Sequence, residues 1–209
     1  MATFKIRPAA VEDCEEIFRM SEELNIDEKL PGSSEYVTVE SLKQGGFGDE
    51  KFFHAIVVET IEPADGLPKK NTEEESTNQN CSTDNSTLPD SLVEKAANQR
   101  SRLLGYATYS FCFGTYGPGR VLFLQDIYVE KEHRRKDIGK ALFIELAKIA
   151  LSKRCQEVNW HAFSWNSGAV EFYKKLRATN ATTKINLHSF FMDYKDISRL
   201  VTESKEADQ

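Results

Sequence analysis

Alternating and continuous apolar segments predict the strands of this chain. Residues 3–7 alternate between apolar and polar side chains, whereas 51–60 and 103–112 are rich in aromatic and β-branched residues, a composition typical of strands. The last two segments are expected to pair as antiparallel neighbours. Two further strands are predicted over 157–163 and 184–194.

Apolar residues spaced three and four positions apart predict the helices. This spacing indicates a helix over 10–24, with acidic residues crowded into its first turns, where the helix dipole favours them. Shorter helices are expected over 37–45 and 167–176, and Asn166 or Ser167 would cap the second of these.

An apolar run over 121–129, followed by an amphipathic pattern over 138–150, is the part of the chain that points to a ligand. The run is nearly continuous, as in a strand covered on both faces, and only Gln125 and Asp126 interrupt it. Between run and helix lies a cluster of cationic residues: Lys131, His133, Arg134, Arg135, Lys136 and Lys140. Because these cations gather where a helix begins and its free N–H groups point outward, the stretch predicts an anion site. The alternative is an ordinary solvated surface.

Polar residues replace large apolar ones almost completely over 62–102. Such a segment cannot bury enough apolar surface to order itself, so we predict a disordered insertion at a hairpin tip, with 91–99 as a marginal helix. Outside it, residues 1–200 are expected to form a single domain, and 201–209 a flexible charged tail. The order of strands and helices predicts an α/β or α+β fold with a sheet of mixed strand direction.

Composition excludes several classes of function. A formal net charge of -6 argues against general binding to nucleic acid or to a membrane surface, because both need a basic surface. The four cysteines are scattered and show no metal-ligand spacing, so no metal site is predicted. Neither a signal peptide nor an apolar run of about 20 residues is found, which predicts a cytoplasmic or nuclear location. Phosphate-loop and dinucleotide glycine motifs are also absent.

Several segments together resemble one enzyme family. They are FKIRPAAVEDCEEI, GGFG followed by FFHAIVVE, LQDIYV, RRKDIGKAL and WNSGAVEFYKKL. In order and spacing they are similar to the spermidine/spermine (diamine) N-acetyltransferases of the GNAT superfamily, on both sides of the insertion. The resemblance implies a GNAT fold with a mixed twisted sheet flanked by helices, acetyl-CoA as cofactor, a small cationic amine as substrate, and a homodimer.

The resemblance also implies a set of cofactor-binding residues. A strand segment would pair through its backbone with the pantetheine arm: Ile127, Tyr128 and Val129. A turn and the first residues of a helix would wrap the pyrophosphate: Arg134, Arg135, Lys136, Asp137, Ile138, Gly139 and Lys140. The start of the next helix would complete the site: Asn166, Ser167, Gly168 and Ala169. Where the family has glycines, this chain has Asp137 and Arg177, and Asp137 adds a negative charge beside the pyrophosphate.

Catalysis by direct transfer needs a base for the amine and an acid for the departing thiolate. Tyr173 matches the family's acid, although the same pattern without the resemblance more often marks a core aromatic. The family's base is a glutamate where this chain has Gln125, and an amide has no useful basicity. Asp126 points to the opposite face of a regular strand, so it substitutes for the base only if a bulge re-aims it.

The expected substrate contacts come from two regions. Asp27 and Glu28 lie in the segment 25–35, which is predicted to be a loop and could equally be solvated surface. The later strand would contribute three more residues: Asn159, Trp160 and His161. Three hypotheses remain open: an active N-acetyltransferase for a small aliphatic amine, a degenerate member that binds CoA or a protein without efficient turnover, and a scaffold that binds no CoA.

Overall fold

The computed structural model describes residues 4–30, 37–61, 102–114, 119–185, 192 and 194–207. By its internal contacts the chain divides into two compact units, Met1–Phe163 and Ser164–Gln209. Most of the predicted insertion, residues 62–101, lies outside the described residues, and so does its predicted helix over 91–99.

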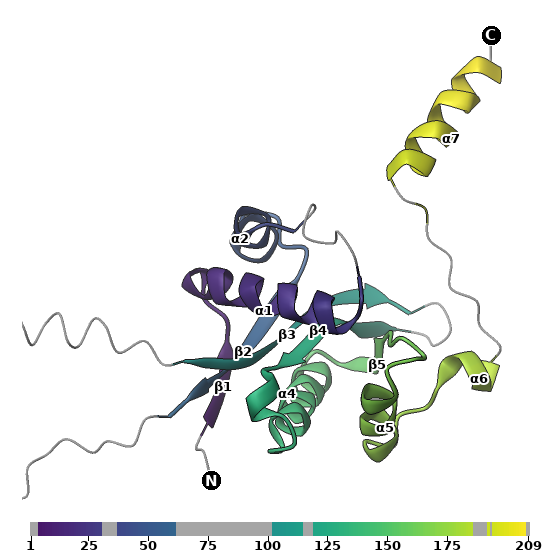
Figure 1. The fold of residues 1–209 in the computed structure, drawn as a ribbon. Coiled ribbons are helices and arrows are strands. Elements are labelled where there is room, and N and C mark those ends of the chain that lie inside the picture. The colour runs from purple at the N-terminus through teal and green to yellow at the C-terminus, as the bar shows by residue number, and fades with distance from the viewer. Residues whose placement is uncertain are drawn as a thin grey trace, which may run out of the picture. The chain divides into compact units, whose positions relative to one another are not determined.

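The first unit is built on one five-stranded sheet (Figure 1). Its strands are β1 (Phe4–Pro8), β2 (His54–Thr60), β3 (Leu103–Phe113), β4 (Arg120–Val129) and β5 (Cys155–Trp160), in that order across the sheet. All neighbours are antiparallel except β4 and β5, which are parallel. The predicted mixed sheet and the antiparallel pairing of β2 with β3 are therefore confirmed.

Helices cover both faces of this sheet. Helix α1 (Cys14–Asp27), with α2 (Val39–Phe47) beside it, lies over one face, and α4 (Ile138–Ser152) lies over the other (Figure 1). The α1 side buries Ile17 and Met20 against Val57, whereas the α4 side buries residues such as Leu142 against Ile56. Neighbouring strand residues serve opposite cores because successive side chains point to opposite faces of a sheet.

Two predicted boundaries differ because the backbone finds other partners. Helix α1 continues to Asp27 rather than ending at residue 24, and the amide of Glu28 still donates to the carbonyl of Leu24 at 2.8 Å. Strand β2 begins at His54 rather than at residue 51, since the amide of Phe52 donates to the carbonyl of Gly45 at 2.7 Å instead of joining the ladder.

The predicted strand over 157–163 is displaced toward the N-terminus. Strand β5 runs from Cys155 to Trp160, and its ladder with β4 extends from Arg120 opposite Cys155 to Leu124 opposite Trp160. The pairing stops at Leu124 because the next residue of β4 is displaced from the regular strand by a bulge, which is described below.

The second unit is helical in its described residues, with α5 (Ser167–Lys175), α6 (Ala181–Ile185) and α7 (Tyr194–Ala207). The predicted strand over 184–194 is wrong at both ends, because residue 184 lies in α6 and residue 194 begins α7; residues 186–191 and 193 are not described. The backbone carbonyl of Asn180 accepts from the amide of Lys184 at 3.1 Å, which closes a helical turn there. Helix α7 continues through most of 201–209, where a flexible tail was predicted.

Candidate active site

A β-bulge interrupts strand β4 at Gln125. Asp126 pairs with Thr108 on β3, and Leu124 pairs with the very next residue of β3, so Gln125 has no partner across the ladder. As a result Leu124 and Ile127, which are three positions apart, both pack on the α4 side of the sheet. In a regular strand they would point to opposite faces. The sequence predicted that Asp126 could replace the base only if a bulge turned its side chain to the other face of the strand, and such a bulge is present.

Asp126 lies on the α1 side of the sheet, because Tyr128, two residues further on, packs into the core beneath α1. The Thr108 hydroxyl donates to Asp126 Oδ2 at 3.3 Å and accepts from the Asp126 amide at 3.2 Å. Burial raises the pKa of the Asp126 carboxyl, and the hydrogen bond from Thr108 offsets this shift only in part. A buried carboxylate with a raised pKa is a stronger base than an ordinary aspartate.

Gln125 is exposed and its side chain is turned toward the neighbouring strand. Its Nε2 donates to the Ser110 hydroxyl at 2.8 Å. The position that carries the family's glutamate thus holds an amide bonded within the sheet, and Asp126 is the carboxylate next to it.

Two polar groups accompany Asp126 on the α1 side. Glu28 is the residue that follows α1, and burial, then the charges of Asp126 and Asp27, raise the pKa of its carboxyl. Tyr106 is fully buried, and its hydroxyl has no hydrogen-bond partner among the described residues. Burial, followed by the charges of Asp126 and Glu28, raises its pKa. An ammonium group would satisfy this arrangement, because it can donate to both carboxylates and to the phenol oxygen.

The turn before α4 presents a run of unbonded amides. In the part of the chain that the structure describes, no acceptor lies within hydrogen-bonding distance of the amides of residues 135–140; the first helical bond runs from the amide of residue 141 to the carbonyl of Asp137 at 2.9 Å. Arg135 and Asp137 have φ of 60° and 61°, and Lys136 between them is not left-handed. Such alternation points successive N–H groups into one concavity, a typical anion site.

Each residue of this turn has a distinct place. Ile138 is buried in the core under α4, so only its backbone can serve a ligand, and Gly139 follows it in the first turn of the helix. Arg135, Lys136 and Lys140 are exposed and cationic. The carboxylate of residue 137 makes no capping hydrogen bond to the helix.

At the two positions where this chain lacks the glycine of the family, the backbone has the left-handed conformation that glycine adopts easily. Asp137 has φ of 61° and Arg177 has φ of 62°. A left-handed conformation costs an L-residue roughly 1–2 kcal/mol relative to glycine. The chain thus keeps the backbone geometry that the family builds with glycines, at some cost in conformational energy.

The edge of β4 that faces β5 is open beyond the bulge. Among the described residues β4 pairs with β5 only as far as Leu124. The amide of Glu130 donates to the carbonyl of Leu104 on β3 at 3.0 Å. Because backbone groups alternate between the two edges of a strand, those of Ile127 and Val129 point to the open edge, where the Val129 carbonyl already accepts from Arg134 Nε at 2.8 Å. An extended ligand could pair with them there.

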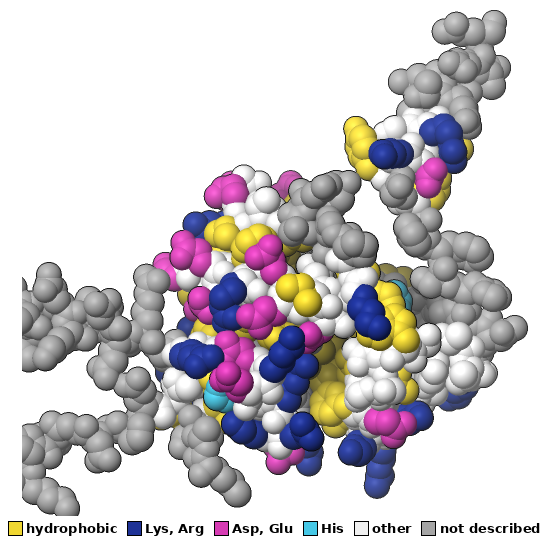
Figure 2. Space-filling model, viewed as in Figure 1, with side chains coloured by type: hydrophobic (Ala, Val, Ile, Leu, Met, Phe, Trp, Pro, Cys, Tyr) yellow, Lys and Arg dark blue, Asp and Glu magenta, His cyan; other side chains and the backbone are white. Residues whose placement is uncertain are grey.

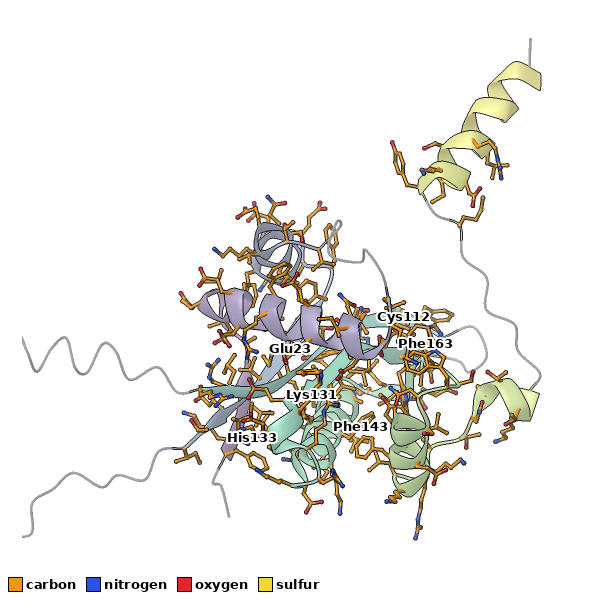
Figure 3. The ribbon with its side chains drawn as sticks, viewed as in Figure 1. Glu23, Cys112, Lys131, His133, Phe143 and Phe163 are labelled. Atoms are coloured by element: carbon orange, nitrogen blue, oxygen red, sulfur yellow. The ribbon has the colours of Figure 1, made fainter. Side chains whose placement is uncertain are left out.

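The side chain of Tyr128 belongs to the core instead. It is buried beneath α1, and its hydroxyl donates to Glu23 Oε2 at 2.6 Å; Figure 3 labels Glu23 on the side of α1 that faces the sheet. Burial, then the bond to Glu23, raises the pKa of Tyr128. Its backbone groups point to β3, where Tyr128 lies opposite Tyr106, so neither its side chain nor its backbone faces the open edge of β4.

Asp27, predicted to contact substrate, is paired with cations of its own chain. Its Oδ1 lies 2.9 Å from Lys131 Nζ, and its Oδ2 lies 2.6 Å from Arg134 Nη2. Burial opposes the charged form of Asp27, but the bonds from Arg134 and Lys131 outweigh it and lower the pKa. Such pairs recur on this face, where Figure 2 shows Lys and Arg interspersed with Asp and Glu.

The remaining predicted substrate residues lie at the end of β5. The Trp160 ring packs edge-on against Phe143, and the His161 ring against Phe123, each with centroids 5.2 Å apart (Figure 3 labels Phe143). The Asn159 amide donates to a neighbouring glutamate at 3.3 Å. Among the described residues no hydrogen bond or ion pair joins these three side chains to Asp126 or Glu28.

The second unit carries the other predicted site residues. Asn166 caps α5 as predicted, because its Oδ1 accepts from the amide of Ala169 at 3.1 Å, and Ser167 and Gly168 form the first turn. Tyr173 is half-buried on the same helix, with its ring centroid 5.5 Å from that of Phe172.

Sequence reasoning missed three side chains of the site. Thr108 and Ser110 hold Asp126 and Gln125, and Tyr106 contributes the unbonded hydroxyl. Thr108 and Ser110 could have been found from the sequence, because they are polar residues within an otherwise apolar strand. Tyr106 offered no such signal, because a tyrosine in such a strand reads as core.

Two kinds of feature are absent from the described residues. None of the helices found there combines the length and apolar character needed to cross a bilayer. No group of His, Cys, Asp and Glu side chains in those residues is arranged to hold a metal ion.

Comparison with known proteins decides the family. The acetyltransferase (GNAT) family matches residues 57–177, more than half of the chain and including the bulge and the turn before α4. This chain belongs to the GNAT acetyltransferases. The predicted fold class is confirmed, and acetyltransferases of this family use acetyl-CoA as donor.

Two relatives place the chain more closely. Thialysine N-epsilon-acetyltransferase of Sus scrofa is 34% identical over 91% of this chain and 92% of its own length. Human spermidine/spermine N(1)-acetyltransferase-like protein 1 is 23% identical over 97% of this chain, but over only 24% of that longer protein. The resemblance inferred from the motifs is thereby confirmed.

A solved structure supports the same fold. An integron cassette protein from the mobile metagenome of V. cholerae superposes with a TM-score of 0.61 at 19% identity, covering 96% of this chain and 98% of that one. At this identity the likeness shows the fold alone.

Proposed function

We propose that this chain is an acetyl-CoA-dependent N-acetyltransferase that acetylates a small aliphatic amine, either a polyamine or diamine or a lysine-like compound. The observation that carries the proposal is the run of unbonded amides over 135–140 at the start of α4. Two relatives carry the names thialysine N-epsilon-acetyltransferase and spermidine/spermine N(1)-acetyltransferase-like protein 1, and these names support an aliphatic amine as acceptor.

The residues present fit acetyl-CoA. The amides of 135–140, with the charges of Arg135, Lys136 and Lys140, suit a diphosphate. The backbone groups of Ile127 and the amide of Val129 at the open edge of β4 suit the amide-bearing pantetheine arm. The first turn of α5, residues 166–169, is proposed to complete this site. Bound acetyl-CoA supplies an acetyl group activated as a thioester.

Asp126 is proposed as the base. Its raised pKa brings the carboxylate closer to the working pH of a general base, and Thr108 fixes its orientation. Glu28 and the Tyr106 hydroxyl would hold an ammonium group of the acceptor, while Asp126 accepts the proton released when the amine attacks. Tyr173 is proposed to return a proton to the departing sulfur.

A degenerate member is the second candidate, favoured by Gln125 and by the left-handed non-glycine residues Asp137 and Arg177. Such a protein would bind CoA, or a protein partner, without efficient turnover. The homodimer implied by the resemblance and the cytoplasmic location predicted from the sequence belong to the first proposal.

Direct binding and turnover distinguish the candidates. The purified chain would be titrated with CoA by calorimetry and then assayed with acetyl-CoA and a panel of spermidine, putrescine, lysine and thialysine, recording free thiol. We expect CoA to bind and at least one amine to be acetylated. Binding without turnover across the panel would favour the degenerate protein, and no binding of CoA would exclude the acetyltransferase and leave a protein that acts through a protein partner.

Replacing Gln125 by glutamate tests where the base lies. If Asp126 is the base, Gln125→Glu changes the rate by no more than about twofold, whereas a chain that has lost its base should gain the factor of about 100 or more that general-base catalysis supplies. We expect the first outcome, measured as kcat with saturating acetyl-CoA.

A further inference from the structure

We propose that Asp27 is a positioning residue, which holds the turn 134–137 in its anion-binding conformation and so compensates for the absence of glycine at positions 135 and 137. The inference rests on the proposed function, because the turn is the part of the chain that would bind the diphosphate of acetyl-CoA.

The contacts of Asp27 fix the beginning of the turn. Its two carboxylate oxygens bind Lys131 and Arg134 separately, at 2.9 Å and 2.6 Å; Figure 3 labels Lys131, beneath α1. Arg134 is held at two more points, since its Nε donates to the Val129 carbonyl at 2.8 Å and its Cζ lies 5.1 Å from the centroid of the Tyr128 ring. The end of α1 is thus joined both to the turn and to the strand that precedes it.

The turn has little else to hold it. Arg135 and Asp137 are left-handed, a conformation that other L-residues seldom adopt without support from their surroundings. The Asp137 side chain does not cap α4, and within the described residues the amides of 135–140 have no acceptor. The amide of Arg134 makes only a long bond, 3.4 Å, to the Lys131 carbonyl. Besides the contacts of Arg134 with β4, the restraint on the turn therefore comes from a residue more than a hundred positions away, Asp27.

The alternative role for Asp27 is to neutralise two surface cations, and it predicts the opposite result. A carboxylate near an anion site weakens binding of the anion by direct repulsion. If neutralisation were the whole effect, Asp27→Asn would free Lys131 and Arg134 for the diphosphate and tighten CoA binding. If Asp27 positions the turn, the same substitution weakens CoA binding.

The first experiment measures the affinity of the full chain for CoA by calorimetry. We expect Asp27→Asn to weaken binding about tenfold, on the scale of two partly exposed ion pairs. Asp27→Glu should restore part of the loss because it keeps the charge. Glu145→Gln is the matched control: it removes the same charge from an i,i+3 pair with Lys148 on α4, away from the turn, and should not change the affinity. Unchanged or tighter binding by Asp27→Asn would overturn the inference.

The second experiment repeats Asp27→Asn in a chain that also carries Arg135→Gly and Asp137→Gly. Glycine adopts the left-handed conformation without strain, so the turn no longer needs the restraint. The loss of affinity on removing Asp27 should then shrink to about twofold. An undiminished tenfold loss in the glycine background would mean that Asp27 acts by another route.

A third measurement does not depend on CoA. Amide hydrogen exchange in the free protein is followed at residues 133, 134 and 141, whose amides donate to the carbonyls of residues 130, 131 and 137. It should accelerate in Asp27→Asn and stay unchanged in Glu145→Gln, with circular dichroism confirming that both fold. If the unsubstituted chain binds no CoA, the proposed function fails, and the exchange experiment alone decides whether Asp27 holds the turn. Equal exchange in both variants would refute the positioning role.

Discussion

At the scale of single residues, position in the sheet sets the chemistry of the carboxylates. Asp126 is partly buried because the bulge at Gln125 turns it under α1, and burial raises its pKa. Asp27 and Glu28 are adjacent in sequence, yet bonded cations lower the pKa of Asp27, whereas burial raises the pKa of Glu28. Identical functional groups thus acquire different properties: the carboxylate of Asp27 pairs with the turn, and those of Asp126 and Glu28 have a raised pKa and are proposed to serve the amine.

Replacing Asp126 by asparagine should abolish the base and also change stability with pH. We expect kcat to fall by a factor of about 100 or more, the usual contribution of a general base. Because the folded-state pKa of Asp126 is raised, its contribution to stability is present below the unfolded-state pKa and is lost as pH rises through the folded-state value. Asp126→Asn should therefore raise the free energy of unfolding more at pH 8 than at pH 4. Urea unfolding at both pH values checks this, and an equal effect at both would contradict it.

Thr108 should control the pH at which the base works. Thr108→Val removes the hydrogen bond that lowers the pKa of Asp126, so the pKa rises further. The acidic limb of the kcat/KM profile is expected to move to higher pH. Ser110→Ala is the control, because Ser110 bonds Gln125 and should leave that limb in place. A limb that moves in Ser110→Ala but not in Thr108→Val would remove Asp126 from the mechanism.

At the scale of elements, the turn before α4 combines an anion site with residues that strain it. Its amides are unbonded because a helix starts there, and their direction comes from left-handed backbone at Arg135 and Asp137. Asp137 adds a negative charge without capping the helix. The conformation of this turn therefore suits a diphosphate, but two of its residues, Arg135 and Asp137, disfavour that conformation.

Asp137→Gly should tighten CoA binding. Glycine removes both the left-handed strain of roughly 1–2 kcal/mol and a carboxylate beside the proposed diphosphate, so the dissociation constant should fall about tenfold. Calorimetry measures it. Arg177→Gly relieves the same strain in the second unit, since Arg177 has φ of 62°, and should leave CoA affinity unchanged. Weaker binding in Asp137→Gly would show that the carboxylate helps to hold the turn.

At the scale of the whole molecule, the sheet of the first unit sets the spacing between the proposed base and the cofactor turn. Both lie on β4 or directly after it, and β3 carries the side chains that orient Asp126. Gly105 on β3 permits the close approach of these strands, since a Cβ there would lie 2.5 Å from the Tyr128 carbonyl oxygen.

Gly105→Ala should destabilise the fold. The added methyl meets backbone, which cannot move without disturbing the ladder, so we expect a loss of about 1–3 kcal/mol or more. Gly168→Ala is the matched control, because the nearest atom to its added Cβ is Asn166 Oδ1 at 3.8 Å and alanine is favoured over glycine in a helix by about 0.5–1 kcal/mol. Urea unfolding should show opposite signs for the two, and equal stability would contradict the close packing of β3 on β4.

The sequence by itself determined the strands and main helices of the first unit, the cationic turn and the family, because hydrophobic period, charge and motif spacing are local properties of the chain. It did not reveal that Asp27 pairs with Arg134, that a bulge turns Asp126 toward α1, or that the Tyr106 hydroxyl is buried without a partner. It also predicted a strand over 184–194, whereas residue 184 lies in α6 and residue 194 begins α7. Only the tertiary structure decided these points. Each depends on which distant segments come into contact, or on the face of the sheet to which a side chain points after the bulge shifts the register.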